Sequence, residues 1–334
     1  MSERSILVTG GAGYIGSHTC KRLSAEGFLP VVYDNLSTGN RRAVRWGPLV
    51  EADITDKAAF VAACERYRPE AVVHFAASAY VGESVADPDK YYRNNVYGTL
   101  SMLRACREVG VGNVVFSSSC AVYGDVQSAP VDERAPLAPV SPYGRTKLIG
   151  ECMLDDFGLA YGLRYAALRY FNACGADPDG ELGEWHDPET HLIPRALLAA
   201  AGQIERLEIY GDDYPTPDGT CVRDYIHVSD LARAHTLALR RLLHGASSMR
   251  INLGAGRGSS ISEVLGAIKR VTGRPVPYVM KPRRPGDATA LFADTALARK
   301  VLGFIPELSS LETTVRTAAP VFGLCCDAPV DAHA

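Results

Sequence analysis

A tyrosine and a lysine four residues apart are the side chains of this sequence best suited to chemistry. Tyr143 and Lys147 follow Ser141-Pro142, a typical helix start, so both fall on one face of the predicted helix. A phenol has a pKa of about 10 and is a poor base at neutral pH, but a fixed ammonium nearby favours the phenolate. Ser119 ends a predicted strand, from which its hydroxyl can reach the same substrate oxygen. This group predicts proton transfer to and from a hydroxyl.

A glycine-rich segment near the N-terminus predicts a dinucleotide site. Gly10, Gly13 and Gly16 open a predicted helix, and they allow a tight turn, a close approach to a pyrophosphate and close helix–sheet packing. The helix start then offers free N–H groups to the phosphates. Asp34 ends the second predicted strand, where a carboxylate accepts bonds from both ribose hydroxyls and repels a 2′-phosphate, so NAD is favoured over NADP. Asp53 closes the third strand and is either an adenine contact or a helix N-cap.

Short apolar runs that alternate with amphipathic stretches must position these side chains. The predicted strands are too uniformly apolar to have an exposed face, which indicates a parallel sheet covered on both sides. Strand–helix alternation of this kind predicts right-handed βαβ units, and therefore an α/β fold with a doubly wound parallel sheet. The strands are expected at residues 6–8, 30–33, 48–50, 71–75, 113–116 and 165–168, and the helices at 56–67 (capped by Thr55 or Asp56), 90–109 and 143–161.

The amino-acid composition of the sequence changes after about residue 171. Gly, Pro and Asp become dense, and helical patterns return at 193–203, 229–243 and 261–272. We therefore predict a Rossmann domain over residues 1–172 and a smaller, loop-rich lobe over 173–334. One helix, near residues 230–244, is expected to return and pack on the sheet.

Composition and charge narrow the class of protein. The 334 residues are 47% hydrophobic and 22% charged, as in ordinary globular domains rather than disordered chains. The 35 Lys and Arg residues nearly balance 38 Asp and Glu residues, and no basic stripe is visible, so no nucleic-acid partner is expected. No apolar run approaches the roughly 18 residues that a membrane span needs. The N-terminus is not typical of a signal peptide, and nine scattered cysteines without a C-x-x-C pair suit reduced thiols, so we expect a cytoplasmic protein without a membrane partner.

Several motifs resemble those of the extended short-chain dehydrogenase/reductase family. The similarity extends from about Ser5 to Leu302, and within the family it is closest to the UDP-sugar 4-epimerases. This resemblance implies a Rossmann fold, NAD as cofactor, a UDP-sugar substrate and a homodimer formed by the helices near 90–109 and 143–161. The most specific matches are Val8-Thr9-Gly10-Gly11-Ala12-Gly13-Tyr14-Ile15-Gly16, Tyr33-Asp34-Asn35-Leu36, His74-Phe75-Ala76-Ala77, Ser117-Ser118-Ser119 with Val122-Tyr123-Gly124, Leu168-Arg169-Tyr170-Phe171-Asn172, Val222-Arg223-Asp224-Tyr225-Ile226-His227-Val228 and Arg283-Arg284-Pro285-Gly286-Asp287.

The resemblance assigns a role to each reacting residue. It implies that UDP-glucose and UDP-galactose are interconverted, with Tyr143 taking the proton of the 4-hydroxyl while hydride passes from carbon 4 to NAD. The 4-keto sugar then turns and takes hydride back on its other face. Ser119 would share the substrate hydroxyl, Lys147 would hold the nicotinamide ribose, and the positive nicotinamide would help to lower the pKa of Tyr143.

The same resemblance divides the remaining site residues between cofactor and substrate. The diphosphate is expected on Arg223 and Arg284, because bidentate Arg donors suit phosphate oxygens, and the uridine ribose is expected on Asp287. The substrate pocket is completed by Asn172, His191, Leu192, Glu208, Ile209, Tyr210 and Leu291. The adenosine half of NAD is expected on Tyr14, Ile15, Asp34, Asn35, Leu36, Ser37, Thr38, Gly39, Asp53 and Ile54, and the rest on Phe75, Ala76, Ala77, Ser78, Ala79, Asn94, Ser119 and Phe171.

Three positions depart from the best-known family pattern. Ala79 stands where some members place a Lys near the cofactor phosphates, and His191 replaces an Asn. Leu291 stands where a Tyr narrows the sugar pocket in some members. The choice of sugar therefore stays open between UDP-hexoses, UDP-N-acetylglucosamine and the pentose pair UDP-xylose and UDP-arabinose.

Three other kinds of protein or site fit the residues less well. A sugar-nucleotide 4,6-dehydratase needs an Asp-Glu pair directly after the strand-end hydroxyl, where this chain has Cys120-Ala121. A non-catalytic NAD-sensing protein would have little use for Tyr143, Lys147 and two phosphate-binding arginines together. The stretch from Trp185 to His191 fits neither a zinc HExxH helix nor an EF-hand loop, and Pro188 breaks any helical face, so no metal is expected.

Overall fold

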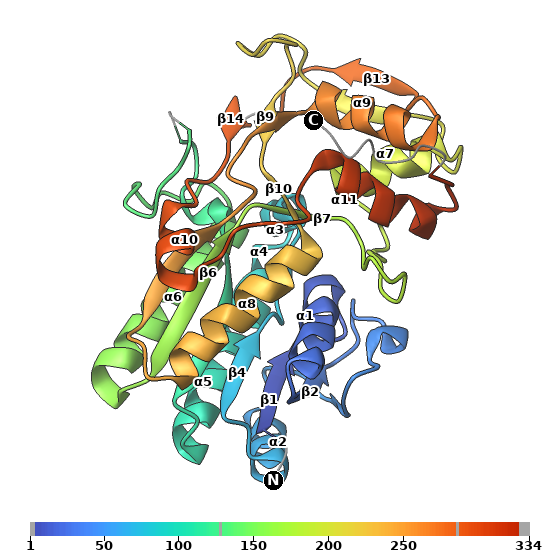
Figure 1. Cartoon of the computed structure of the whole chain (residues 1–334). Coiled ribbons are helices and arrows are strands. Elements are labelled where there is room, and N and C mark those ends of the chain that lie inside the picture. Colours follow the sequence, from blue (N-terminus) through green and yellow to red (C-terminus); the bar gives the residue numbers. More distant parts are fainter. Residues whose placement is uncertain (1–3, 127–128, 285–286, 327–334) are drawn as a thin grey trace.

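A seven-stranded parallel sheet forms the centre of the molecule (Figure 1). The computed structural model describes residues 4–126, 129–284 and 287–326. The strands run in the order β11-β6-β5-β4-β1-β2-β3, and every neighbouring pair is parallel. The doubly wound α/β fold predicted from the sequence is confirmed. The strand bounds are β1 Arg4–Thr9, β2 Phe28–Asp34, β3 Leu49–Glu51, β4 Ala71–His74, β5 Asn113–Ser119, β6 Arg164–Tyr170 and β11 Met249–Leu253.

Helices cover both faces of the sheet, because successive strand residues point to opposite sides. In β1, Ile6 and Val8 join the core under one set of helices, and Leu7 joins the core under the other set. Figure 1 shows α1 and α8 on the same side of the sheet. Both faces of the sheet are therefore shielded from water by helices, which explains why the strands are uniformly apolar. The first set is α1 Tyr14–Ala25, α8 Val228–Leu243 and α10 Ala296–Leu302, and the second is α2 Lys57–Tyr67, α5 Gly98–Val109 and α6 Pro142–Tyr161.

The structure differs from the predicted elements in several places, two of which bear on the central sheet and its helices. The helix expected over 90–109 is α4 Pro88–Tyr91, a π-helical segment over Tyr92–Tyr97 and then α5. Strand β11 is absent from the sequence prediction, because polar residues interrupt its apolar ones. The helix expected near 230–244 is α8, which packs against α1 and the central strands. The sheet thus takes in residues well beyond 172, and the division of the chain at that residue stays a prediction.

The smaller lobe has a core of its own, formed by three helices over a parallel strand pair. The helices are α7 Leu192–Ala200, α9 Ile261–Thr272 and α11 Leu311–Ala318, and the strands are β8 Leu207–Tyr210 and β13 Tyr278–Lys281. Two further small sheets pair β7 Asn172–Cys174 with β10 Tyr225–His227, and β9 Val222–Arg223 with β12 Ser259–Ser260 and β14 Ala290–Leu291. The short helices are α3 Val81–Ala86, η1 Arg41–Ala43, η3 Cys120–Val122 and η4 Ala319–Phe322. Among the described helices, none has the length and apolarity that crossing a membrane requires.

The reversal of strand order places several predicted site residues at one edge of the sheet. The first strand, β1, pairs with β2 on one side and with β4 on the other. Ligands of doubly wound sheets bind at such a point, outside the carboxyl ends of the strands. Gly10, Phe75 and Phe171 directly follow β1, β4 and β6, and Ser119 ends β5, so all four lie at this edge.

A buried ion cluster fastens α6 to the sheet. The Glu151 carboxylate of α6 accepts hydrogen bonds from Arg169 Nε (2.9 Å) and Ser118 Oγ (2.6 Å), and from Arg250 Nε of β11 (3.2 Å). The side chains of Glu151 and Arg169 are each only 1% exposed. Removing one partner of such a pair leaves a buried charge without compensation, which is strongly destabilising.

Glu151→Ala should therefore lower the free energy of unfolding by about 3–5 kcal/mol, because the Arg169 guanidinium would lose its carboxylate. The control is Glu312→Ala, which breaks an exposed pair with Arg270 and should cost about 1 kcal/mol or less. Urea unfolding followed by circular dichroism measures both changes. Equal losses in the two variants would contradict the role given to the buried cluster.

Candidate active site

The turn after β1 is too tight for any side chain at two of its glycines. Gly10 has φ +69°, and a Cβ there would lie 2.6 Å from the backbone nitrogen of Ala76, which follows β4. A Cβ on Gly16 would lie 2.2 Å from the carbonyl oxygen of Gly10. Gly13 is the N-cap of α1 and supplies no side-chain acceptor to the N–H groups of the first turn. The backbone thus leaves a cradle of amides at a helix start, which suits a phosphate.

Asp34 lies at the end of β2 beside this turn. Its Oδ2 accepts from the backbone nitrogen of Ala12 (3.0 Å) and its Oδ1 from that of Leu36 (2.8 Å). Burial raises the pKa of Asp34, and the two amide bonds oppose that rise. A Cβ on Gly39 would lie 2.8 Å from Asp34 Oδ1, so the loop over residues 35–39 covers the carboxylate closely.

Asp53 is not the cap of α2, so one of its two sequence interpretations is wrong. The cap is Asp56, which accepts from the backbone nitrogen of Ala59 (3.0 Å). Asp53 instead accepts from Thr55 Oγ1 (2.6 Å) and Asn35 Nδ2 (2.8 Å). Burial acts to raise the pKa of Asp53, but these bonds outweigh it and lower the pKa. The carboxylate therefore stays ionised and links the loops after β2 and β3.

Tyr143 and Lys147 lie together in the first turns of α6, as their spacing predicts. Ser141 caps the helix by accepting from the backbone nitrogen of Gly144 (3.1 Å). Lys147 Nζ lies 5.8 Å from the centre of the Tyr143 ring and donates to the carbonyl oxygen of Ser117 (2.7 Å). Tyr143 is 8% and Lys147 4% exposed. No carboxylate of the described residues forms an ion pair with Lys147, so its charge remains available to a ligand.

Burial controls the acidity of both reacting groups. It raises the pKa of Tyr143, with a further rise from Tyr170, while a hydrogen bond with Ser119 acts to lower it. It lowers the pKa of Lys147 to about 8. The sequence argument expected the Lys147 ammonium to lower the pKa of the phenol, but in the chain alone desolvation is the larger effect. In the chain alone, Tyr143 is therefore protonated at neutral pH.

Neighbouring residues hold these groups in place, and the sequence analysis did not single them out. Asn95, in the π-helical segment, accepts from the backbone nitrogen of Ser78 (2.8 Å) and donates to its oxygen (3.0 Å). The same amide donates to Thr146 Oγ1 (3.1 Å), between Tyr143 and Lys147 on α6. The loop after β4 and the reacting helix are thus fixed by one side chain. The sequence signal for this role was the pair of polar residues Asn94-Asn95 within a predicted helix. The structure places both in the π-helical segment, and such segments are common at functional sites.

The residues predicted to bind substrate lie in two parts of the structure, some near the edge of the large sheet and some in the smaller lobe. Arg223 in β9 pairs with Leu291 of β14 in register, and its Nη2 lies 3.6 Å from Asp287 Oδ1. Leu291 packs on the cluster that contains Phe171, near the sheet edge. The Arg284 guanidinium lies 3.8 Å over the centre of the Tyr210 ring, in the smaller lobe.

Other predicted substrate residues have different partners. Ile209 is buried in the core of the smaller lobe. The exposed Glu208 carboxylate accepts from the Tyr210 hydroxyl (2.7 Å). Asn172 Nδ2 donates to the carbonyl oxygen of Asp224 (2.8 Å), and Leu192 is the first residue of α7. His191 Nδ1 lies 2.6 Å from Glu184 Oε1, so one edge of its imidazole faces the loop that precedes α7.

Asp224 is a further positioning residue. Its buried carboxylate accepts from the backbone nitrogens of Ala293 (3.0 Å), Ala255 (2.6 Å) and Gly256 (3.3 Å). Burial raises its pKa to about 6, although the amide bonds oppose the rise. It fastens β9 and the chain after β14 to the end of β11, which joins the smaller lobe to the sheet edge.

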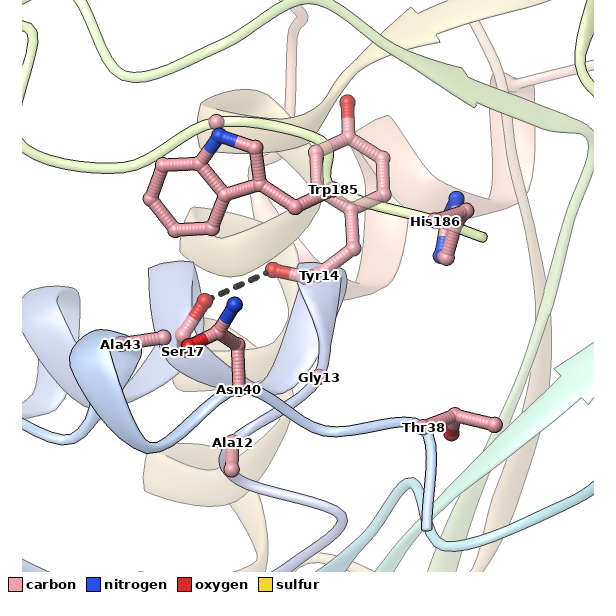
Figure 2. A pocket seen from close by; sticks show the side chains of 10 residues that line it. Ala12, Gly13, Tyr14, Ser17, Thr38, Asn40, Ala43, Trp185 and His186 are labelled. Atoms are coloured by element: carbon pink, nitrogen blue, oxygen red, sulfur yellow. Dashed lines mark hydrogen bonds between the residues drawn. The ribbon is translucent and has the colours of Figure 1, made fainter. Parts of the chain in front are cut away.

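A pocket lies beside the glycine turn (Figure 2). The start of α1 forms one wall with Gly13, Tyr14 and Ser17, and Thr38 and Asn40 form a second. Figure 2 shows Trp185 and His186 on a segment that passes over the start of α1. The Tyr14 hydroxyl donates to the carbonyl oxygen of Gly175 (2.6 Å), so the smaller lobe is fastened directly to this wall.

Comparison with known proteins gives one consistent result. Residues 6–254 match the family model described as NAD dependent epimerase/dehydratase family. The chain belongs to this family. It is 53% identical over 307 residues to a UDP-glucose 4-epimerase of Rhizobium meliloti, a match that covers 92% of this chain and 94% of that protein.

Two solved structures are also close to this member of the family. The UDP-glucose 4-epimerase from Brucella ovis in complex with NAD is 62% identical, has a TM-score of 0.95, and matches 97% of this chain and 99% of its own. The UDP-glucose-4-epimerase from Stenotrophomonas maltophila with bound NAD and formylated UDP-arabinopyranose is 40% identical, has a TM-score of 0.93, and matches 96% of this chain and 98% of its own.

The residues of this family member fit the dinucleotide that the family name implies. The cradle at Gly10 and Gly16 is too narrow for a Cβ, the first turn of α1 has no side-chain cap, and Asp34 presents a carboxylate at the end of β2. These are the features that hold a pyrophosphate and a ribose in doubly wound folds. A carboxylate at that position disfavours the 2′-phosphate of NADP.

Gly16→Ala should remove most of the NAD that copurifies with the protein, because the added Cβ forces the turn off the carbonyl of Gly10. The matched control is Gly112→Ala, where an added Cβ meets no atom within 4 Å. Denaturing each purified variant and assaying NAD in the supernatant checks this, with circular dichroism as the test of folding. A folded Gly16→Ala variant with its full complement of NAD, or release of NADP by wild type, would contradict the assignment.

Proposed function

We propose that the protein interconverts UDP-glucose and UDP-galactose by transient oxidation of the sugar at carbon 4, with Tyr143 as the acid and base. The observation that carries this proposal is the burial of Tyr143 beside Lys147 and Ser119, at the sheet edge that also holds the glycine turn. Its near full-length similarity to UDP-glucose 4-epimerases supports the same reaction.

The chain's own residues move the proton and hold the sugar. When bound, NAD takes a hydride from carbon 4 and returns it to the opposite face. Tyr143 accepts the proton of the 4-hydroxyl and later gives it back, and the Ser119 hydroxyl shares that oxygen. The buried Lys147 ammonium and the positive charge of the oxidised cofactor offset the desolvation of the phenolate. The one proton and the one hydride taken from the sugar are both returned in each cycle, so no net oxidation occurs.

The second lobe holds the nucleotide. Arg223 and Arg284 neutralise the diphosphate, and Asp287 accepts from the uridine ribose. Arg223 is already oriented by bonds to the carbonyl oxygens of Val222 (2.9 Å) and Ala288 (2.8 Å). Asn172, Leu192 and Tyr210 complete this wall of the pocket. A guanidinium whose rotamer is fixed before binding loses less conformational entropy when the diphosphate arrives.

The protein acts as a homodimer in the cytoplasm. Exposed apolar side chains support the dimer: Tyr92 and Tyr97 lie in the π-helical segment before α5, and Leu159 and Tyr161 lie at the end of α6. None of the nine cysteines, which all lie among the described residues, forms a disulfide, and this fits a reducing compartment. Light scattering during gel filtration measures the mass, and a monomer at micromolar concentration would contradict the dimer.

Tyr143→Phe should lower turnover by on the order of 100-fold or more, because it removes the proton acceptor while leaving the ring in place. The matched control is Tyr165→Phe, which removes the hydroxyl of a buried tyrosine that bonds Asp155 away from the site. Steady-state conversion of UDP-galactose, with NAD content measured on the same samples, checks both. A loss of less than about tenfold at unchanged NAD content would exclude Tyr143 as the base.

A second activity, on UDP-N-acetylglucosamine, is favoured by Leu291. This aliphatic side chain packs on the cluster that contains Phe171, and a larger side chain there would take space that the acetamido group needs. Wild type should epimerise both UDP-N-acetylglucosamine and UDP-glucose, and Leu291→Tyr should suppress only the N-acetylated substrate. Resolving the epimers formed from each sugar tests this. A wild type inactive on the N-acetylated sugar, or equal loss of both activities in the variant, would show that Leu291 is not the gate.

A further inference from the structure

The segment between β7 and α7 gathers four potential metal ligands. Glu184, His186, Glu189 and His191 each place one ligand atom so that all four atoms lie within 4.8 Å of one another. The four ligands come from eight consecutive residues, in a loop without helical or strand structure. The sequence patterns for zinc helices and calcium loops do not describe such a loop, which is why the spacing alone did not predict this cluster.

Three histidine-to-carboxylate separations within the cluster are close to the edge length of a coordination tetrahedron, and the two that involve Glu189 use different oxygens of its carboxylate. Zinc bound at its usual distances of about 2.0–2.1 Å requires ligand atoms about 3.3–3.5 Å apart. His186 Nδ1 lies 3.2 Å from Glu184 Oε1 and 3.6 Å from Glu189 Oε2. His191 Nδ1 lies 3.5 Å from Glu189 Oε1 and 2.6 Å from Glu184 Oε1. The last of these is a hydrogen bond and is shorter than a tetrahedral edge.

One ligand atom in the cluster has no hydrogen-bond partner among the described residues. His186 Nδ1 is buried and, despite its distance to Glu184, makes no hydrogen bond of acceptable geometry. It faces two carboxylates whose side chains are themselves only 3% (Glu184) and 8% (Glu189) exposed. A nitrogen without a hydrogen bond that lies between two buried carboxylates is an arrangement that a cation would satisfy.

The charge balance of the four-residue cluster also favours a bound cation. No lysine or arginine of the described residues forms an ion pair with Glu184 or Glu189. A nearby acidic cluster, Asp177, Asp179 and Glu181, differs in this respect, because Lys21 Nζ lies within 2.8 Å of all three. The two carboxylates of the loop therefore need two positive charges from the imidazoles or from one divalent cation.

We propose that Glu184, His186, Glu189 and His191 form a structural binding site for a divalent transition-metal ion, with Zn²⁺ as the best fit. Two imidazoles and two carboxylates suit zinc in both donor type and geometry. Because the protein supplies all four ligands, no position remains for substrate, and the ion is structural rather than catalytic. It ties the loop together where His186 contacts the rings of Tyr14 and Tyr80, each with centroids 6.1 Å away.

Metal content of the untagged holoenzyme tests the proposal. Purified wild type should contain about one zinc per chain by plasma mass spectrometry, as a closed four-ligand site requires. His186→Gln and Glu189→Gln should each weaken Zn²⁺ binding by on the order of 100-fold, measured by calorimetric titration after removal of metal with a chelator. The matched control is His244→Gln, which changes an exposed histidine outside the cluster and should leave binding unchanged.

Cobalt replacement provides a readout that does not depend on activity. Co²⁺ added to the metal-free protein should give the visible absorption of a tetrahedral site, and Glu189→Gln should shift or abolish it. NAD content and circular dichroism show whether each variant is folded; if His186→Gln does not fold, Glu189→Gln and the cobalt spectrum of wild type decide. No uptake of Zn²⁺ or Co²⁺ by wild type would overturn the proposal and leave an imidazole–carboxylate ion-pair network. Unchanged binding by both variants would also overturn it.

Discussion

The close approach of two backbone segments, at Gly10 and Ala76, is the constraint on which the rest of the structure depends. It brings the end of β1 against the chain leaving β4, where the strand order of the described parallel sheet reverses on either side of β1. Because no side chain fits between them, the first turn of α1 points its amides into the space above both strands. The ends of β5 and β6, where Ser119 and Phe171 lie, then face the same space. The start of α6, which carries Tyr143, lies beside the end of β5, where Tyr143 meets Ser119.

The fold was predictable from the sequence where periodicity is strong. Strands such as β1 and β4 are buried on both faces, so their apolar runs are unbroken, and glycines punctuate the first turn. Strand β11 was not predicted, because its polar residues Arg250 and Asn252 bond to other elements. Arg250 donates to Glu151 of α6, and the Asn252 amide donates to the carbonyl oxygen of Val131 (2.9 Å). Its polar residues satisfy partners far away in the sequence, which a local pattern does not reveal.

The candidate site was predictable to a different extent. Tyr143, Lys147 and Ser119 follow from the order of residue types along one helix and one strand. The residues that hold them do not, because Asn95 and Asp224 act on backbone atoms whose identity carries no sequence signal. Electrostatics also required the structure. The pKa of Tyr143 depends on how deeply the ring is buried, and desolvation outweighs the charge of a lysine that spacing alone suggests as the dominant influence.

The position of β11 and α8 has a consequence for how the chain is made. Residues 228–253 complete a sheet whose other six strands lie before residue 171. Until that segment leaves the ribosome, β6 is an unprotected edge strand, and the face of β1 that presents Ile6 and Val8 lacks α8. The nascent chain must therefore carry a sheet that lacks one edge strand until that strand is synthesised. About 80 further residues are added between the end of β6 and the end of β11. During that interval the growing polypeptide is most exposed to aggregation, and a holding chaperone has a defined surface to bind.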